Sequence, residues 1–496
     1  MNEGAMSLDR DFAIAYPVSG DIRNIVQTVN ALPEDYSGNL TVLLSDVDGI
    51  LVARNLLLLA VLGSIDDSAQ AAEIALHLWY SAFIRPTDVA VLCHIIGSLL
   101  EQMVHGDSVT VKLWEQFMPA DSFSIQLGKH SILKGALARY PPSNDPSHPN
   151  GGLCCAQTHL MDFQEFNMKL NELDLKEELD HAFKSMHDVR FDPSRADFHD
   201  RRGCYLEQPS HRLADFKFRK MGIVLPFGAD NGDFCIPNRT MFSADGKWLS
   251  KDTADPLGSW NIDDIVLAGQ ARGAQTEDLY GCLYFYLSDQ LRTFAERLKH
   301  FRITFHLLDA PSTAVSADIR AGTLEQLGLP KTISFDRIDV SSEIDTDAFN
   351  VLADWAPLLS STNSHATIVG HFLAWTRRGD PPISSIGEVM ARLYEEQAFH
   401  YRSPATVIVL KKYIHARWEN SGPFAEYLET RYTKQNAKKA GVQLKHKHTV
   451  VPHRVCTPID GASNMLPVFK DKNSMYLNIC VASTPMSERF VEFCRL

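Results

Sequence analysis

The stretch Phe12-Ala13-Ile14-Ala15-Tyr16-Pro17-Val18-Ser19-Gly20-Asp21 decides the expected fold. Its first half is a short apolar run that predicts a strand, and its second half predicts a turn. Apolar residues then recur at helical spacing over residues 22–29, and Pro33 ends that segment. A second apolar run at residues 40–44 and an apolar helical stretch at residues 50–62 follow. This order of strand, helix, strand and helix predicts a parallel sheet covered by helices.

Composition and charge place the chain among ordinary globular proteins. It has 496 residues, of which 45% are hydrophobic and 22% are charged. These values exclude a disordered, collagen-like or disulfide-framework protein. The formal net charge of -13 opposes binding to nucleic-acid phosphates. The N-terminus lacks a basic region followed by an apolar run, and no apolar stretch is long enough for a membrane span. We therefore expect a cytoplasmic protein that does not enter a membrane.

Polar residues follow the expected strands at the points where they end. Five residues, Ser19, Gly20, Asp21, Asp46 and Asp48, follow the first two strands, and a third polar strand end spans residues 339–343. Ligands of doubly wound sheets bind outside the carboxyl ends of the strands, where an acidic residue accepts ribose hydroxyls. These five residues are the candidate cofactor-binding residues, although a capped turn would need the same residue types.

Four further residues are candidates for substrate contact. Asp309 ends a later alternating strand at residues 301–308, and His199 and Arg202 lie in a dense polar stretch at residues 195–202. Arg54 lies within the apolar helical stretch, where a charge needs a partner. An ion pair with Asp46 or Asp48 is the simplest expectation for Arg54, and a substrate contact is the alternative.

The later elements resemble those of class I AdoMet-dependent methyltransferases. In that family an acidic residue ends the second strand, and a strand reading roughly Phe-Asp-x-Ile comes later. Here Phe335-Asp336-Arg337-Ile338, then Pro357-Leu358-Leu359, then Ala366-Thr367-Ile368-Val369 is similar to that order. The family's multi-glycine first loop is represented by Gly20 alone. The resemblance implies a Rossmann-like fold and S-adenosylmethionine as cofactor.

A second resemblance covers more of the chain. Tyr16-Pro17-Val18-Ser19-Gly20-Asp21-Ile22-Arg23-Asn24, and Asp46 followed by Arg54-Asn55-Leu56-Leu57, resemble a domain family of unknown function. That family is common in fungal proteins, some with MYND zinc fingers, and is shared with a dynein axonemal assembly factor. Asp278-Leu279-Tyr280-Gly281-Cys282 and Ser364-His365-Ala366-Thr367 are also similar to fungal members.

The expected fold is a mostly parallel Rossmann-like sheet with a large, mainly helical insertion. Residues 1–66 form the first part, residues 67–300 the insertion or substrate region, and residues 301–496 the remainder with a C-terminal extension. In that extension, residues 450–459 and 475–482 are strand candidates for an antiparallel hairpin.

Three functions are compatible with this expectation. The first is a transferase that uses AdoMet in fungal small-molecule metabolism, where positioning of donor and acceptor supplies much of the catalysis. The second is an aminoacyl-tRNA-dependent transferase of the cyclodipeptide-synthase type. Its tRNA contact would be the basic stretch at residues 434–448, although the net charge disfavours tRNA. The third is a non-catalytic assembly protein that retains the fold.

No metal is expected. Cys154, Cys155 and His159 form a local cluster, but adjacent cysteines are poor structural zinc ligands. The motifs of serine hydrolases, zinc proteases and P-loop enzymes are missing from the sequence, so the catalytic residues are not predicted.

Overall fold

Nine strands form one sheet in the described part of this computed structural model. They are β1 (Phe12–Tyr16), β2 (Asn39–Asp46), β4 (Val109–Lys112), β5 (Ile132–Leu137), β7 (Arg302–Asp309), β8 (Arg337–Asp339), β9 (Thr367–Phe372), β10 (Val442–Leu444) and β11 (Arg489–Arg495). Strands β3 (Phe83–Ile84) and β6 (Ile236–Pro237) pair separately. The structure describes residues 8–104, 109–112, 132–137, 155–170, 174–191, 206, 208–250, 255–373, 375–378, 386–388, 391, 406–431 and 433–496.

The sheet has the order β10-β11-β9-β8-β1-β2-β7-β5-β4. The strands from β9 to β5 run parallel, while β11 is antiparallel to β9 and β4 is antiparallel to β5. From β1, the chain builds first toward β2 and β7 and later, on the other side, toward β8 and β9. The point of reversal therefore lies between β1 and β8. The predicted mixed α/β class with a mostly parallel sheet is confirmed.

Helices connect and cover these strands. They are α1 (Arg23–Asn30), α2 (Gly49–Ser64), α3 (Ser68–Tyr80), α4 (Pro86–Val104), α5 (Cys155–Met168), α6 (Leu175–Arg190), α8 (Pro209–Met221), α9 (Ile262–Ala271), α10 (Leu279–His300), α11 (Ser312–Ala321), α12 (Glu343–Trp355), α14 (Thr406–Arg417), α15 (Ser421–Thr430), α16 (Thr433–Lys439) and α17 (Lys472–Tyr476). Short 3-10 turns lie at Pro256–Ser259, Glu325–Leu327, Ala356–Leu358 and Trp375–Arg378, and a π-helical turn lies at Leu477–Val481.

The two faces of the sheet enter two different cores, because successive strand residues point to opposite faces. Ile14, Val42 and Phe305 belong to the core that includes α1, α2 and α10. Their neighbours Ala15 and Leu43 belong to the core with α11 and α12. The central strands are thus buried on both faces, as expected for parallel strands.

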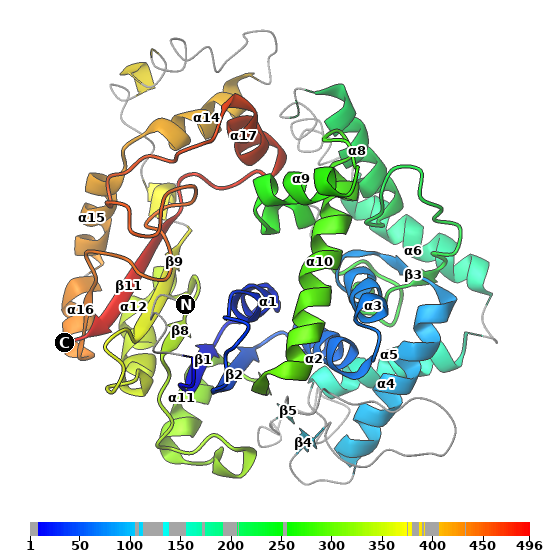
Figure 1. Ribbon diagram of the computed structural model, residues 1–496, viewed down its shortest axis with the longest axis horizontal. Helices are drawn as coiled ribbons and strands as arrows, with labels where there is room; N and C mark the ends of the chain where they lie inside the picture. Colours follow the sequence, from blue (N-terminus) through cyan, green and yellow to red (C-terminus); the bar gives the residue numbers. More distant parts are fainter. Residues whose placement is uncertain are drawn as a thin grey trace.

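Figure 1 shows how distant segments meet around β1 and β2. The helices α2 to α10 lie on one side of the view, and α12, α15, α16, β9 and β11 lie on the other. Helix α1 stands between the two groups, seen nearly end-on. The elements near the start of the chain therefore hold together the two large parts of the molecule.

The predicted elements of residues 12–62 are confirmed, and so is the strand that ends at Asp309. The segment of residues 67–300 contributes β4 and β5 to the sheet, which the sequence did not predict. Within the expected helical insertion, residues 155–190 contain the two helices α5 and α6.

The residues predicted for the C-terminal hairpin were wrong. An antiparallel pair is present, but it is β10 with β11, joined by a long connection. Residues 475–481 are helical, in α17 and the π-helical turn that follows it, and the Asp471 carboxylate caps α17 by accepting from the N–H of Ser474 at 2.8 Å. Residues 450–459 contain no strand. The apolar run at residues 475–482 is buried on most sides, and periodicity alone does not separate such a helix from a strand.

Candidate functional site

The turn after β1 is fastened to the end of β2. Gly20 has a φ of 55°, a left-handed conformation that favours glycine. Its N–H donates to Asp46 Oδ2 at 3.0 Å, and its carbonyl accepts from Asn55 Nδ2 at 2.8 Å. The N–H of Ser19 donates to the carbonyl of Ser45 at 2.8 Å. The structure therefore brings together the polar residues that the sequence placed at the first two strand ends.

Asp46 and Asp48 have different surroundings. Asp46 is buried, and its second oxygen, Oδ1, accepts from the N–H of Asp48 at 2.9 Å. Both of its oxygens are thus engaged by backbone groups. Asp48 is exposed and caps α2 by accepting from the N–H of Ile50 at 3.0 Å. Asp46 shapes the crevice, whereas Asp48 presents a solvated carboxylate beside it.

Further ionisable groups lie along the same edge of the sheet. Asp309 is the register partner of Asp46 on the neighbouring strand. Burial raises the pKa of Glu343 at the start of α12, and the charge of Asp46 adds to this rise. A hydrogen bond with Ser312 acts in the opposite direction and lowers the pKa. Burial lowers the pKa of His159 on α5, whereas the charges of nearby carboxylates, Asp309 among them, raise it. The carboxyl edge is therefore rich in acidic groups.

Arg54 does not form the ion pair expected from the sequence. No ion pair joins it to Asp46, Asp48 or any other described residue. Its Nε atom is shielded from solvent and has no hydrogen-bond acceptor among the described residues. Burial lowers the pKa of Arg54, and the charge of Asp21 opposes that shift. The side chain instead lines a cavity with Asp21 on the far side of the turn.

The other two predicted substrate contacts, His199 and Arg202, lie outside the described residues. Cys154 also lies outside them, and α5 begins at Cys155. Within the described ranges, no group of three or more His, Cys, Asp or Glu side chains has an arrangement that could hold a metal ion.

A cavity of about 630 Å³ lies on the α1 face of the sheet, beside the point of chain reversal. Its floor comes from β1, β8 and β9, one wall comes from α1, and Val450, Val451, Ile459 and Phe490 close another side. Its volume is in the usual range for small-molecule sites. Asn24 and Gln27 on α1 are exposed, so the cavity reaches the surface.

Asp339, at the end of β8, is the central ionisable group of this cavity. Its Oδ1 accepts from the N–H of Ser341 at 2.9 Å, and its Oδ2 accepts from Asn24 Nδ2 at 3.4 Å. Burial raises the pKa of the Asp339 carboxyl. Ser341 has a φ of 50°, a strained conformation for a residue with a side chain. Both features are typical of functional sites.

The phenol of Tyr16 and the imidazole of His371 lie near Asp339. The Tyr16 hydroxyl hydrogen bonds to the Thr28 hydroxyl at 3.2 Å, and burial raises the pKa of Tyr16. His371 on β9 bonds through Nε2 to Glu488 at 2.8 Å and stacks on Phe490. Tyr16, Asp339 and His371 all line the cavity. The sequence pointed to Asp339 through the polar strand end at residues 339–343, but it assigned neither Tyr16 nor His371 to a site.

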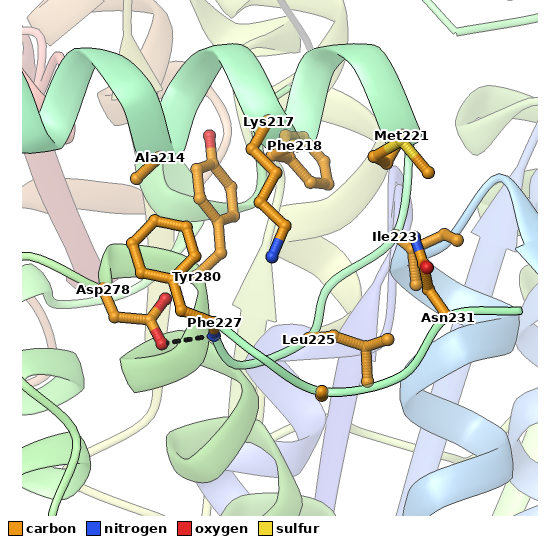
Figure 2. A pocket seen from close by; sticks show the side chains of 11 residues that line it. Ala214, Lys217, Phe218, Met221, Ile223, Leu225, Phe227, Asn231, Asp278 and Tyr280 are labelled. Atoms are coloured by element: carbon orange, nitrogen blue, oxygen red, sulfur yellow. Dashed lines mark hydrogen bonds between the residues drawn. The ribbon is translucent and has the colours of Figure 1, made fainter.

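The motif that begins at Asp278 has a structural role. Figure 2 shows the Asp278 carboxylate against the N–H of Phe227, which donates to it at 2.7 Å. The same carboxylate accepts from the N–H of Gly281 at 2.9 Å and caps α10. A Cβ on Gly281 would lie 2.1 Å from Asp278 Oδ2. Asp278 and Gly281 are therefore both needed to join the loop at Phe227 to the start of α10.

The basic stretch at residues 434–448 is partly neutralised. Lys445 binds Glu492 at 3.0 Å, and Lys434 lies 3.7 Å from Glu429. Glu492 is fully buried. Lys445 is therefore part of the core around β11 and is not a free surface cation.

Comparison with known families bears on the first elements. Residues 2–84 match the model of a family described as a domain of unknown function (DUF4470). This confirms the resemblance to a family of unknown function for the segment from the N-terminus to β3. The description names no chemistry, and the methyltransferase resemblance is not confirmed by it. No curated protein and no solved structure matches the chain. Among the described residues, no helix combines the length and apolar character that a bilayer crossing requires.

Proposed function

We propose that the protein is a transferase that binds S-adenosylmethionine beside the β1–β8 reversal point. The observation that carries the proposal is the cavity of about 630 Å³, which is lined by these two strands. In open α/β sheets, ligands bind where the strand order reverses, outside the carboxyl ends of the strands. Asp339 and the turn after β1 belong to those ends.

The strand order supports a Rossmann-like scaffold of the methyltransferase-like kind. The segment β7-β2-β1-β8-β9 follows the doubly wound order 3-2-1-4-5. In this proposal, residues 1–66 and 301–496 supply the scaffold, and residues 67–300 are a mainly helical insertion that also extends the sheet.

The charge of the edge favours a nucleoside ligand without phosphates. Asp46, Asp309 and Glu343 lie along the edge outside the cavity and would repel a pyrophosphate placed there, whereas Arg23 and Arg337 line the cavity itself. AdoMet carries a sulfonium, an ammonium group and a ribose, all of which suit carboxylates. Both oxygens of Asp46 are engaged, and Asp48 does not line the cavity, so a ribose contact with Asp48 requires the ligand to extend beyond the cavity toward the end of β2.

The residues of the cavity fit a group-transfer site. When bound, AdoMet supplies an activated methyl group. Asp339, whose pKa burial raises, accepts a proton from the attacking group of the acceptor substrate. Tyr16 and Asn24 orient ligands through their polar groups, and Val450, Val451 and Phe490 exclude water. The protein acts on a small molecule in the cytoplasm, within fungal metabolism.

Isothermal titration calorimetry with AdoMet and NAD tests this proposal. We expect heat from AdoMet and none from NAD, because NAD carries a pyrophosphate. Mass spectrometry of ligands retained by the purified protein provides an independent readout. Absence of AdoMet heat at about millimolar concentration contradicts the proposal.

A non-catalytic assembly role is the second candidate, and Asp46 favours it. In that case the strand-end carboxylate serves the fold alone, because backbone N–H groups engage both of its oxygens. AdoMet would then give no heat. The aminoacyl-tRNA alternative loses Lys445 as a contact, since that residue pairs with buried Glu492, while Lys438, Lys439 and Lys447 stay exposed.

A further inference from the structure

A second cavity, of about 160 Å³, lies across the turn from the first. Asp21 of the turn and Arg54 of α2 form one side. Trp79 and Tyr80 of α3, Arg190 of α6 and Trp248 line the remainder. The cavity therefore lies between the sheet-forming start of the chain and the helices of residues 67–300.

Two residues that line this cavity, Arg54 and Trp248, each have a buried donor atom without an acceptor among the described residues. The two atoms are Arg54 Nε and Trp248 Nε1, and both are shielded from solvent. An unsatisfied buried donor costs about 1–3 kcal/mol, more when it belongs to a charged group. Such groups are rare in native proteins unless a ligand or water completes them. The pair indicates that a hydrogen-bond acceptor belongs in the cavity.

The charges show which acceptor fits. Asp21 faces the same cavity, but both of its oxygens already accept from Arg23 Nε at 2.9 Å. Arg54 has no ion-pair partner among the described residues, so its charge calls for one additional anion. Asp255 also lines the cavity and disfavours a dianion such as a phosphate group. A single carboxylate is therefore the best complement.

The residues that line the cavity indicate which chemical group carries the carboxylate. Trp79 and Tyr80 are stacked on each other, with ring centroids 4.9 Å apart. Arg190 lies over the ring of Trp248, with its guanidinium carbon 4.8 Å from the centroid, and donates to the carbonyl of Arg219 at 2.9 Å. Aromatic side chains on two sides suit a flat apolar body.

We propose that this cavity binds a small aromatic carboxylate, with Arg54 and the Trp248 indole N–H as donors to the carboxylate. This molecule is a second ligand of the protein, bound apart from the proposed AdoMet cavity. The Asp21–Arg23 pair separates the two cavities, since Asp21 lines the second and Arg23 lines the first.

Calorimetry or ligand-observed NMR with benzoate, benzamide and phenyl phosphate tests the inference. We expect benzoate to bind about tenfold or more tightly than benzamide, which has the same shape without the charge. Phenyl phosphate should bind more weakly than benzoate. Equal binding of benzoate and benzamide, no binding of benzoate, or a preference for phenyl phosphate would overturn it.

Variants locate the site. Arg54→Met should weaken benzoate binding about tenfold or more and leave the protein at least as stable, because it removes an unpaired shielded charge. Trp248→Phe keeps the aromatic wall, removes the donor, and should weaken benzoate binding several-fold, about the value of one hydrogen bond. Unchanged benzoate binding in both variants contradicts the inference. Benzoate binding in a protein that fails to bind AdoMet would retain this site and reject the transferase proposal.

Discussion

Arg23 donates through its Nε atom to both carboxylate oxygens of Asp21, at 2.9 Å each. The same carboxylate accepts from the backbone N–H of Arg23 at 3.1 Å, so the pair is fixed at the first turn of α1. Arg23 lines the cavity over β1 and β8, and Asp21 lines the cavity of Arg54. One short turn therefore contributes to two sites, and its geometry should control both.

The conformation of Gly20 provides the first test of that turn. A Cβ at Gly20 would meet no atom within 4 Å, so Gly20→Ala adds no clash. It does place a side chain at a φ of 55°, which costs about 1–2 kcal/mol. We expect urea denaturation to show a loss of that size. Gly422→Ala is the matched control, because its Cβ also meets nothing within 4 Å and its φ is not left-handed. Equal effects of the two changes would contradict this explanation.

Asp46 should matter for stability and Asp48 should not. Asp46→Asn replaces one of two acceptors with an amide donor that faces a backbone N–H, at a cost of about 1–3 kcal/mol. Asp48→Asn keeps a good helix cap, so its change in unfolding free energy should be near zero. Thermal denaturation of both variants checks the difference. A neutral Asp46→Asn would show that the turn is held by other contacts.

The Asp339 carboxyl should lower the free energy of unfolding at neutral pH and should also be needed for transfer activity. Because burial raises its pKa in the folded state, folding is disfavoured above the unfolded pKa of 3.8. Asp339→Asn keeps an acceptor for the N–H of Ser341 and should raise the unfolding free energy at pH 7, with the gain vanishing as the pH falls toward 3.8. Transfer activity should be lost. The exposed control, Asp35→Asn, should change neither property. A less stable Asp339→Asn protein at pH 7 would refute this account of the carboxyl.

The His448–His453 pair should make the protein sensitive to mild acid. The two rings stack 3.5 Å apart, and burial lowers the pKa of His448 to about 4. Because the unfolded chain binds the proton more tightly, stability should fall as the pH decreases from 6.5 toward 4. The slope from this residue is at most about 1.4 kcal/mol per pH unit.

The comparison of His448→Gln with wild type isolates this effect. The variant should show a shallower slope between pH 6.5 and 5, above the range in which Glu492 begins to gain a proton. Hydrogen bonds from the backbone of Val450 and Val451 and the charge of Lys445 lower the pKa of Glu492 against the effect of burial. His365→Gln, at an exposed position, should leave the slope unchanged. Identical slopes for wild type and His448→Gln would exclude His448 as the source.

Local patterns predicted the parts of the fold that depend on neighbouring residues. The strand at residues 12–16, the turn with Gly20 and α1 follow from apolar spacing and turn chemistry, and all three are confirmed. Residues 475–482 were assigned wrongly, because a continuous apolar run fits a buried helix as well as a buried strand. The strands β4 and β5 were missed within a segment whose pattern is mostly helical.

The polar strand ends of the site, including residues 339–343, were predictable from the sequence, but their contacts were not. The strand-end rule located Asp46 and Asp48 but gave no sign that backbone N–H groups engage both Asp46 oxygens. The large cavity depends on the register of β1 with β8, which brings Ile14 opposite Arg337 from far along the chain. Asp339 and Asn24 meet only through that pairing. Arg54 was recognised as unusual, but its relation to Trp248 depends on the packing of separate helices.

Calorimetric titration of AdoMet into wild type, Gln27→Trp and Gln27→Ala is the most direct test of the central claim. Gln27 is exposed on α1 and lines the large cavity, so an indole at this position should fill space that the ligand needs without disturbing the core. We predict AdoMet binding to wild type and Gln27→Ala with a Kd of about 1 mM or lower, and none to Gln27→Trp. No binding to wild type, or equal binding to all three proteins, would contradict a nucleoside site between β1 and β8.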